Sequence, residues 1–336
     1  MQLRRERYLA EYLDPRNRFQ RARVPLEVRW DPLTGQSCRL LPEGSIPPPV
    51  QHDLEQLAAE TRPTCPFCSE SLEQQTPRFA PEIASGGRIR CGEAVLFPNL
   101  VPYAKWSSVS VYSPELHQLP IEKLTPSLVA DNVTTQVEFA RAVAARDTES
   151  TWISINANQL PPSGSSVFHP HLQGAASPVP TTVQRLLADL PAGAVREYIE
   201  LERRSNERHI ASTGSVEWLA SFAPVGPAEI RAYALEIASP AQLDRRVIEE
   251  FARGLVAVLR VYSDLGYQSF NLALYGAPPG ATQHILALHV VARAYYGPSS
   301  RSDAMWSERL HWDAATDVSP EKVAALARAT FTAVCR

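Results

Sequence analysis

Three side chains that can do chemistry, His169, His171 and Gln173, occupy alternate positions within residues 165–173. If this segment is extended, all three project from one face, with neighbours about 6–7 Å apart. One imidazole could then attack phosphorus while the second binds a metal or orients the first, and the amide could hold the displaced oxygen. Taken alone, the segment fits two surface histidines flanking a proline equally well, so the rest of the chain has to decide.

A Cys-x-x-Cys motif formed by Cys65 and Cys68 raises the question of a metal. Such a pair can be half a zinc site or a redox pair, and a redox pair should follow a strand and open a helix. This motif follows Arg62-Pro63-Thr64 and precedes a polar stretch, which favours zinc. A structural zinc needs two more ligands, and the chain has no second Cys-x-x-Cys motif. His117 and His169 are the best candidates, although His117 also fits an ordinary loop histidine, and a redox or merely structural role for the cysteine pair stays open.

The elements that must hold these side chains follow from turn signals and periodicity. The pattern predicts strands at residues 107–112, 151–156 and 167–173. Thr125-Pro126 and Ser319-Pro320 are typical helix starts, because proline is favoured at the first helical position. A further helix is predicted over about residues 181–208 with a break near Pro191, and a short charged helix over Arg4–Leu13.

The order of elements indicates an internal duplication. In the first half a helix leads to a strand, a Gly/Pro/Ser loop and the strand that carries the histidines. In the second half the same order recurs in the helix 240–264, the strand 269–275, the loop 276–280 and the strand 283–290. The predicted fold is therefore α+β, with two related units at residues 1–180 and 181–336 that share an antiparallel sheet with flanking helices.

Composition places the chain among ordinary globular proteins. It has 336 residues, a hydrophobic fraction of 44%, a charged fraction of 21% and a formal net charge of −3, which gives no reason to expect nucleic acid as a partner. No apolar run approaches the roughly 20 residues needed to cross a bilayer, so no membrane is expected either. Five cysteines and the lack of a signal-peptide pattern favour a cytoplasmic protein with reduced thiols. The arginines crowded into residues 4–23 fit a solvated helix face or a dimer contact better than a phosphate site.

These motifs, taken in order, resemble those of the galactose-1-phosphate uridylyltransferase family, the nucleotidyltransferase branch of the histidine-triad superfamily. The resemblance covers nearly the whole chain and is strongest where order and spacing of several motifs agree. The segments that carry it are Asp31-Pro32-Leu33-Thr34-Gly35, Cys65-x-x-Cys68, Phe97-Pro98-Asn99, Ser113-Pro114-Glu115-Leu116-His117, Asn158, Gly164-Ser165-Ser166 and His169-Pro170-His171-x-Gln173.

The resemblance implies a duplicated histidine-triad-like fold and a role for each of these residues. His169 would complete a structural zinc site, one ion per chain, with Cys65, Cys68 and His117. His171 would attack the α-phosphorus of a nucleotide sugar and carry a nucleotidyl group to a phosphorylated acceptor, which is ping-pong chemistry of the EC 2.7.7 type. Gln173 would assist catalysis. The residues implied to hold the nucleotide and its phosphates are Asn99, Asn158, Gly164, Ser165 and Ser166. A homodimer is the oligomeric state that the resemblance implies.

The chain also departs from the family pattern. Leu172 stands where the family has glycine between the second histidine and the glutamine, and it is expected to remove backbone freedom and to add bulk beside the nucleophile. The phosphate-binding arginines after the N-terminal signature are not evident. His284 and His289 are five residues apart, on opposite faces of a strand, so a second metal is not expected. The part that reads the sugar is therefore expected to differ. A phosphorylase that splits an adenine nucleotide compound with inorganic phosphate, and a non-catalytic nucleotide-binding protein, stay open as alternatives.

Overall fold

The computed structural model describes residues 1–278, 281, 284–294 and 306–335. Residues 279–280 of the predicted loop and Gln283 of the predicted strand lie outside the described residues. Over the described part of the chain, no helix is long and apolar enough to cross a membrane.

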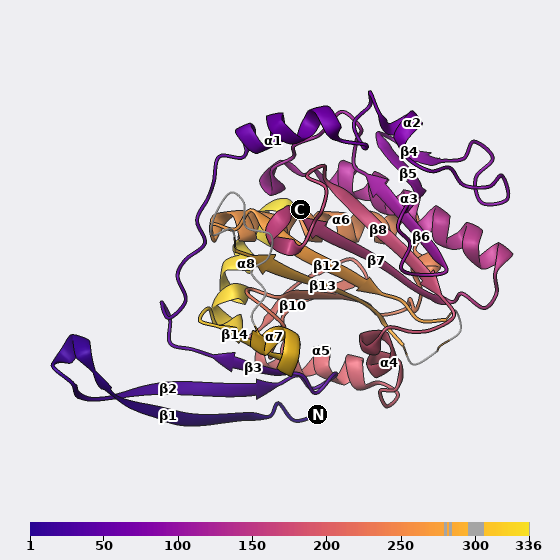
Figure 1. Ribbon diagram of the computed structural model, residues 1–336. Helices are drawn as coiled ribbons and strands as arrows, with labels where there is room; N and C mark the ends of the chain where they lie inside the picture. The colour runs from indigo at the N-terminus through magenta and orange to yellow at the C-terminus, as the bar shows by residue number, and fades with distance from the viewer. Residues whose placement is uncertain (279–280, 282–283, 295–305, 336) are drawn as a thin grey trace.

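One twisted sheet of ten strands runs through the molecule, and every pairing in it is antiparallel (Figure 1). Within this sheet, the strands from the first 180 residues lie together on one side, and the later strands lie together on the other. The two sides are joined where β7 pairs with β12, from Phe270 opposite Gln159 to Tyr275 opposite Ser154. The order across the sheet is β4 (Ile89–Cys91), β5 (Ala94–Pro98), β6 (Trp106–Val111), β8 (His171–Ser177), β7 (Trp152–Gln159), β12 (Ser269–Tyr275), β13 (Leu286–Arg293), β11 (Ile230–Ala234), β10 (Val216–Ala220) and β9 (His209–Thr213).

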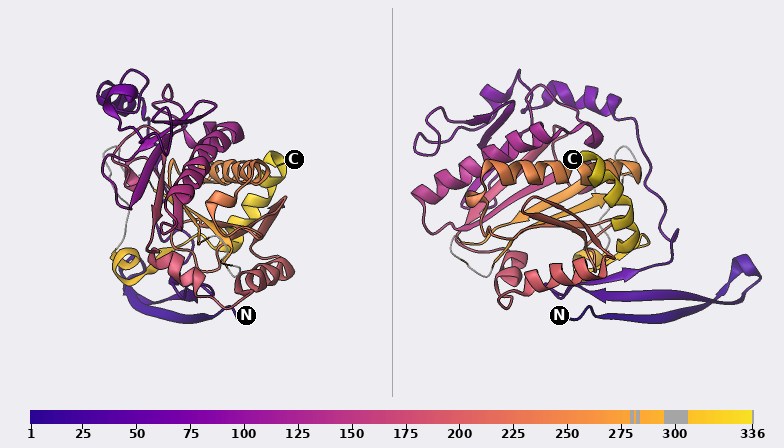
Figure 2. Two further views of the ribbon diagram at one scale, coloured as in Figure 1. Left: turned by 90° about the vertical axis from the view of Figure 1, so that its right-hand side faces the viewer. Right: turned by 180° about the vertical axis from the view of Figure 1, so that it is seen from behind.

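Three long helices cover one face of this sheet: α3 (Pro126–Arg146), α6 (Arg245–Asp264) and α8 (Pro320–Val334) (Figure 2). Each begins at a side chain that accepts a hydrogen bond from a first-turn backbone N–H, namely Thr125, Asp244 and Ser319. Their apolar sides form the main core with alternate residues of the strands. The antiparallel sheet with flanking helices that the sequence predicts is therefore confirmed.

The other face of the sheet is covered mainly over its second half. There α4 (Thr182–Ala188) and α5 (Ala194–Ser205) pack with a small sheet in a second core, whose members include Tyr198, Tyr233 and Cys38. The small sheet has the order β1 (Arg5–Asp14), β2 (Gln20–Trp30), β3 (Ser37–Leu40) and β14 (Asp313–Thr316), and α7 (Trp306–His311) precedes β14. Two short helices, α1 (Glu55–Thr61) and α2 (Leu72–Gln75), flank the Cys-x-x-Cys motif.

The prediction of a helix over Arg4–Leu13 is wrong, because this segment is strand β1. It pairs along its whole length with β2 to form a two-stranded ribbon that extends away from the body (Figures 1 and 2). Tyr8, Ala10 and Tyr12 lie on one face of β1, whereas Arg7 and Glu11 lie on the other, and β2 places Leu26, Val24 and Ala22 opposite the first set. A period of two that is shared between two strands is easily mistaken for a charged helix when one segment is considered alone.

Two predicted boundaries also shift. The histidine-bearing strand begins at His171 rather than at residue 167, since Pro170 has no N–H to pair with a neighbouring strand. The helix predicted to begin at residue 240 is a single 3-10 turn, Pro240–Gln242, and the α-helix itself begins at Arg245.

Candidate active site and metal centre

The candidate site lies on the sheet face that α3 and α6 leave uncovered. Residues that pair directly across strands project from the same face, and Asn156 lies opposite Gln173 while Asn158 lies opposite Asn271. The side chains between them, such as Ile155 and Leu272, belong to the main core on the other face. A row of polar side chains therefore crosses the join between β7 and β12.

His171 is the first residue of β8, and its ring has a defined orientation. The Nδ1 atom lies 2.8 Å from the carbonyl oxygen of His169. A carbonyl only accepts, so Nδ1 carries the hydrogen and Nε2 has the lone pair. The Nε2 atom lies 3.4 Å from the amide nitrogen of Gln173. Burial lowers the pKa of His171 against the opposing effect of its backbone hydrogen bond, so the ring is neutral near neutral pH. A neutral, oriented imidazole is suited to attack phosphorus.

The leucine after His171 is not beside it. Leu172 is 2% exposed and packs in the main core on the opposite face of β8. The expectation that it adds bulk next to the nucleophile is therefore wrong, because neighbouring residues of a strand project to opposite faces.

Asn158 and Gly164 lie together at the edge of the polar row. Asn271 donates hydrogen bonds to the Oδ1 of Asn158 at 2.7 Å and to the carbonyl of Ser163 at 2.9 Å. Gly164 follows the 3-10 turn Pro161–Ser163 with a φ of 92°, which favours glycine. Asn271 was missed by the sequence reasoning. The predicted duplication held a signal for it, because the equivalent strand of the second half lies beside β7.

The remaining predicted nucleotide contacts are spread more widely. Ser165 donates its hydroxyl to the carbonyl of Val167 at 2.7 Å, and Ser166 is exposed in the same loop. Asn99 follows β5, where its Oδ1 accepts from the N–H of Val101 at 3.1 Å. β5 lies three strands from β7, roughly 14 Å away, so a ligand that contacts both Asn99 and Asn158 has to cross β6 and β8.

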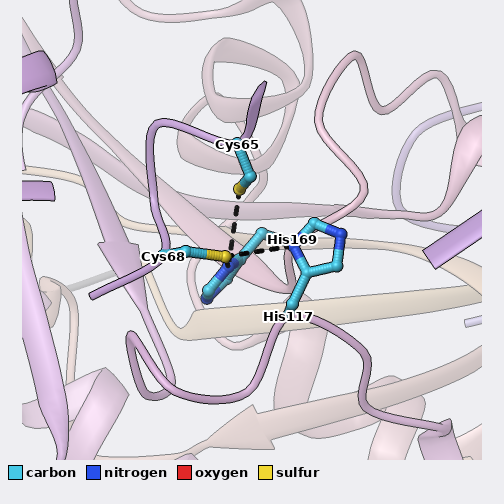
Figure 3. Close-up of side chains that lie close together, drawn as sticks. All are labelled: Cys65, Cys68, His117 and His169. Atoms are coloured by element: carbon cyan, nitrogen blue, oxygen red, sulfur yellow. Dashed lines mark hydrogen bonds between the residues drawn. The ribbon is translucent and has the colours of Figure 1, made fainter. Parts of the chain in front are cut away.

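The two cysteines and two histidines predicted to bind metal come together in a buried cluster (Figure 3). Four ligand atoms, one from each of Cys65, Cys68, His117 and His169, all lie within 4.8 Å of one another. The Cys68 Sγ is 3.3 Å from the Nδ1 of His117 and 3.6 Å from the Nδ1 of His169, and the Cys65 Sγ is 3.7 Å from the latter. A tetrahedron with zinc bonds of about 2.0–2.3 Å has edges of roughly 3.3–3.8 Å. The cluster can hold one metal ion of this kind.

Both histidines of the cluster are held in the tautomer that a metal requires. His169 donates from Nε2 to the carbonyl of Ser113 at 2.9 Å. The hydroxyl of Thr61 donates to the carbonyl of Leu57, so its oxygen accepts from the Nε2 of His117 at 3.0 Å. Both Nδ1 atoms therefore present lone pairs to the centre of the cluster.

Protonation in the cluster follows burial. Burial lowers the pKa of His169 to about 4, so this imidazole is neutral, as a ligand must be. Burial and then the neighbouring Cys65 raise the pKa of the Cys68 thiol to about 12. Two adjacent thiolates in this position therefore need a cation between them.

The second pair of histidines does not come together. His284 precedes β13 and its Nε2 lies 3.2 Å from the carbonyl oxygen of Tyr275. His289 lies within β13, and its Nδ1 lies 2.9 Å from the carboxylate of Glu229.

The chain is similar in sequence to a known protein, although it matches no family model. A protein of Archaeoglobus fulgidus, described as uncharacterized, is 31% identical over 308 residues, which is 89% of this chain and 90% of that protein.

Three solved structures share the fold. An ADP-glucose phosphorylase from Arabidopsis thaliana with bound ADP-glucose has a TM-score of 0.67 and 18% identity, covering 90% of this chain and 98% of that one. A galT-like protein from Arabidopsis thaliana has a TM-score of 0.64 and 19% identity, also covering 90% of this chain and 98% of that one. A uridylyltransferase has a TM-score of 0.59 and 18% identity, covering 91% of this chain and 98% of that one. The chain belongs to one family with the Archaeoglobus protein, and it shares its fold with the ADP-glucose phosphorylase, the galT-like protein and the uridylyltransferase.

Proposed function

We propose that the protein is a nucleotidyltransferase, similar to hexose-1-phosphate uridylyltransferases, that moves a UMP-like group from a nucleotide sugar to a sugar 1-phosphate. The observation that carries the proposal is the buried imidazole of His171, which donates from Nδ1 to a backbone carbonyl and keeps its Nε2 lone pair beside Gln173. A histidine used only for packing does not need this arrangement.

The reaction has two displacements at one phosphorus. The Nε2 of His171 attacks the α-phosphorus, and the bond from that phosphorus to the bridging oxygen breaks, so the sugar 1-phosphate leaves with the electron pair. A phosphate oxygen of the acceptor then attacks the same phosphorus, and the phosphorus–nitrogen bond breaks to release His171. Gln173 would donate to phosphoryl oxygens in both steps.

The proposed contacts to the rest of the substrate come from the nearby loops and strand ends. Asn158 and Gly164 would hold the nucleotide at the join of the two halves, and Asn99 would hold it at the end of β5. The hydroxyl of Ser165 would have to turn from the carbonyl of Val167 to reach a phosphate oxygen, whereas Ser166 is exposed and ready to donate. Residues 1–180 and 181–336 would be the two copies of the duplicated unit, which the separation of early and late strands in the sheet supports.

A second candidate function differs only in the acceptor. If inorganic phosphate takes the nucleotidyl group, the protein is a phosphorylase of an adenine nucleotide compound. The likeness to an ADP-glucose phosphorylase, at a TM-score of 0.67, supports this candidate.

Intact-protein mass measurement after incubation with UDP-glucose or ADP-glucose tests the proposal. An added mass of one nucleoside monophosphate is expected, and His171→Asn should lose it. A matched control is His209→Gln, at the far edge of the sheet, which should keep it. Chasing the adduct with glucose 1-phosphate or with inorganic phosphate separates the two candidates. Binding without any adduct would leave a non-catalytic nucleotide-binding protein and refute both.

We propose further that Cys65, Cys68, His117 and His169 hold one structural zinc ion. The ligand separations and the two fixed tautomers support it. When bound, the ion would cross-link the Cys-x-x-Cys turn, the His117 loop and the residues that lead into β8. Metal analysis of the purified protein should give close to one zinc per chain, and folded protein without zinc would remove the proposal.

We also propose a homodimer, and the ribbon β1–β2 supports it. One face of the ribbon is wholly apolar at its centre, where directly paired positions are Tyr8 with Leu26, Ala10 with Val24, and Tyr12 with Ala22. Tyr8 and Tyr12 are each 42% exposed. An isolated two-stranded ribbon is marginal in water, and a contiguous exposed apolar face marks an interface.

Charge favours a second copy of this chain as the partner of that face. Residues 1–30 contain eight arginines and four acidic side chains, whereas the whole chain has a net charge of −3, so the rest of the chain is acidic. A basic ribbon is complementary to such a body.

Sedimentation of wild type and two variants tests the dimer. Tyr12→Lys should weaken the dimer about tenfold or more, because it places a charge within the apolar face. Leu13→Lys on the other face of the same strand should leave it intact. A wild-type monomer at all concentrations, or equal effects of the two variants, would contradict the proposal.

A further inference from the structure

A cavity of about 550 Å³ lies beside the candidate nucleotide site, on the same face of the sheet. Asn158 and Gly164 line it on one side, and Asn271, Tyr275 and His289 line it from the strands of the second half. β13 lies three strands from β8, roughly 14 Å across the sheet. His289 is also displaced by two residues, about 6–7 Å, along the strand direction, because Asn271 pairs with Val291 and His289 pairs with Ala273. A diphosphate and a sugar ring together are long enough to extend from the nucleophile toward this cavity.

His289 is the unusual residue of the cavity. It is 6% exposed, and its Nε2 is a buried atom that makes no hydrogen bond within the described part of the chain. Its Nδ1 lies 2.9 Å from the Oε1 of Glu229, a carboxylate that also accepts from Arg231 at 2.9 Å. A buried polar atom without a partner costs free energy unless something else supplies one.

The protonation state of this pair follows from its surroundings. Burial opposes ionisation of Glu229, but Arg231 and His289 outweigh burial and hold the pKa of the carboxyl below its usual range. Burial, followed by Arg231, lowers the pKa of His289, so the ring is neutral near neutral pH. A carboxylate accepts from Nδ1, which therefore carries the hydrogen. The Nε2 of His289 is then a lone-pair acceptor, and it needs a ligand that donates.

The rest of the lining indicates what kind of donor. Asn158 offers its side-chain NH2 group, whereas the amide of Asn271 is already bonded to Asn158, Ser163 and Arg293. The aromatic rings of Tyr275 and Trp312 also line the cavity. The ring of Tyr275 meets that of His289 edge to face at 5.2 Å between centroids. Amides that pair with hydroxyls, next to aromatic rings that cover C–H groups, suit a polyhydroxylated ring. A phosphate monoester dianion has no hydrogen to donate, and would leave Nε2 unpaired.

We propose that this cavity binds the sugar of the substrate, with the Nε2 of His289 accepting a hydrogen bond from a sugar hydroxyl. The proposal rests on the proposed function and adds a specificity-determining residue to it. Glu229 and Arg231 act through His289, since they fix which nitrogen keeps the lone pair.

Calorimetric titration of the wild type and of His289→Asn with UDP-glucose, ADP-glucose, UMP and AMP tests the proposal. Asparagine at this position keeps a donor toward Glu229 and removes the Nε2 acceptor. The variant should bind the preferred nucleotide sugar about five- to tenfold more weakly, as expected for one hydrogen bond, and bind the matching monophosphate within about twofold of wild type. His284→Asn is the matched control, because this buried histidine of the same segment does not line the cavity. It should change neither affinity.

A second measurement does not depend on the variant's folding. The affinity of the wild-type protein is measured for a series of nucleotide sugars that each lack one sugar hydroxyl. Loss of the hydroxyl at a single position should weaken binding about five- to tenfold. That same deoxy sugar should lose nothing more in His289→Asn. Nucleotide sugar and monophosphate could both bind while neither removal of a single hydroxyl nor His289→Asn weakens binding of the nucleotide sugar. That result would overturn the inference while the proposed function stands. If neither nucleotide sugar nor monophosphate binds, the proposed function fails and the inference fails with it.

Discussion

Thr61→Val is the sharpest test of the metal centre, because it changes no ligand. Thr61 donates its hydroxyl hydrogen to Leu57 at 2.7 Å, and its oxygen accepts from the Nε2 of His117 at 3.0 Å. Valine has nearly the same shape and no acceptor. The buried Nε2–H of His117 then loses its side-chain acceptor and keeps only the backbone of Ala58 nearby, so the ring can turn its Nδ1 away from the cluster more easily.

The expected loss follows from that single bond. A buried donor without an acceptor costs about 1–3 kcal/mol, and removal of an outer partner of a metal ligand lowers metal affinity by about 10- to 100-fold. The energy range and the affinity range agree, because each tenfold change in affinity corresponds to about 1.4 kcal/mol of binding free energy. Competition with a chromophoric chelator should therefore show zinc held about 10- to 100-fold more weakly by Thr61→Val, in protein that remains folded.

Two companion variants make this result interpretable. Thr61→Ser keeps the hydroxyl and should restore zinc affinity to within about twofold. Thr64→Val removes a hydroxyl from the same turn whose one hydrogen bond among the described residues goes to the carbonyl of Thr61 at 3.5 Å, and it should have no effect. Zinc affinity of Thr61→Val within twofold of wild type would refute the argument that this hydrogen bond orients His117.

The remaining predictions concern stability. Arg231→Met leaves the buried carboxylates of Glu229 and Asp31 without their shared cation and should cost at least about 3–5 kcal/mol of unfolding free energy at pH 7, measured in urea. In wild type the pKa of Glu229 is depressed, so its contribution is present above about pH 4.3 and is lost as the pH falls. In Arg231→Met burial raises that pKa instead, so stability should increase as the pH falls from 8 to 5. Gly174→Ala should cost about 1–3 kcal/mol in the same assay, because a Cβ there would lie 2.2 Å from the Oε1 of the buried Gln136.

Each of these predictions has a result that contradicts it. A variant Arg231→Met that still loses stability in acid would show that Glu229 is neutralised by another group. For Gly174, the control is Gly86→Ala, where the added Cβ meets nothing within 4 Å. Equal stability of the two alanine variants would mean that strand β8 and Gln136 can shift to accommodate the added methyl group at little cost in stability.

The sequence predicted the cluster of cysteines and histidines better than it predicted what surrounds this cluster. The Cys-x-x-Cys motif needed two more ligands, and the family resemblance selected His117 and His169, which the structure brings together. The contact between Asp31 and Arg231 spans 200 positions and depends on how the small sheet packs on the large one. No local pattern encodes such a pairing, so the buried ion-pair network was not predicted.

The N-terminal ribbon and Leu172 show two further reasons why sequence reasoning fails. Both faces of the ribbon are exposed, so neither face has to be uniformly apolar, and the sequence of β1 alone does not show the two-residue repeat of a strand. The repeat becomes visible when β1 is paired with β2. Leu172 was correctly placed next to His171 in sequence, but the alternation of a strand puts it in the opposite layer of the molecule. Adjacency along a chain and adjacency in a site are different properties.

The join between β7 and β12 limits how the protein can move during turnover. Asn158 and Asn271 sit opposite each other across this join, and they are held by a continuous ladder of backbone hydrogen bonds. Opening the two halves like a clamshell would break that ladder and expose both cores, so a hinge between them is too costly to use in each cycle. The sheet therefore forms a rigid base beneath the candidate site. In the proposed reaction, substrates would enter and products would leave through movements of the loops above the sheet, and the rate of those movements would set an upper limit on turnover.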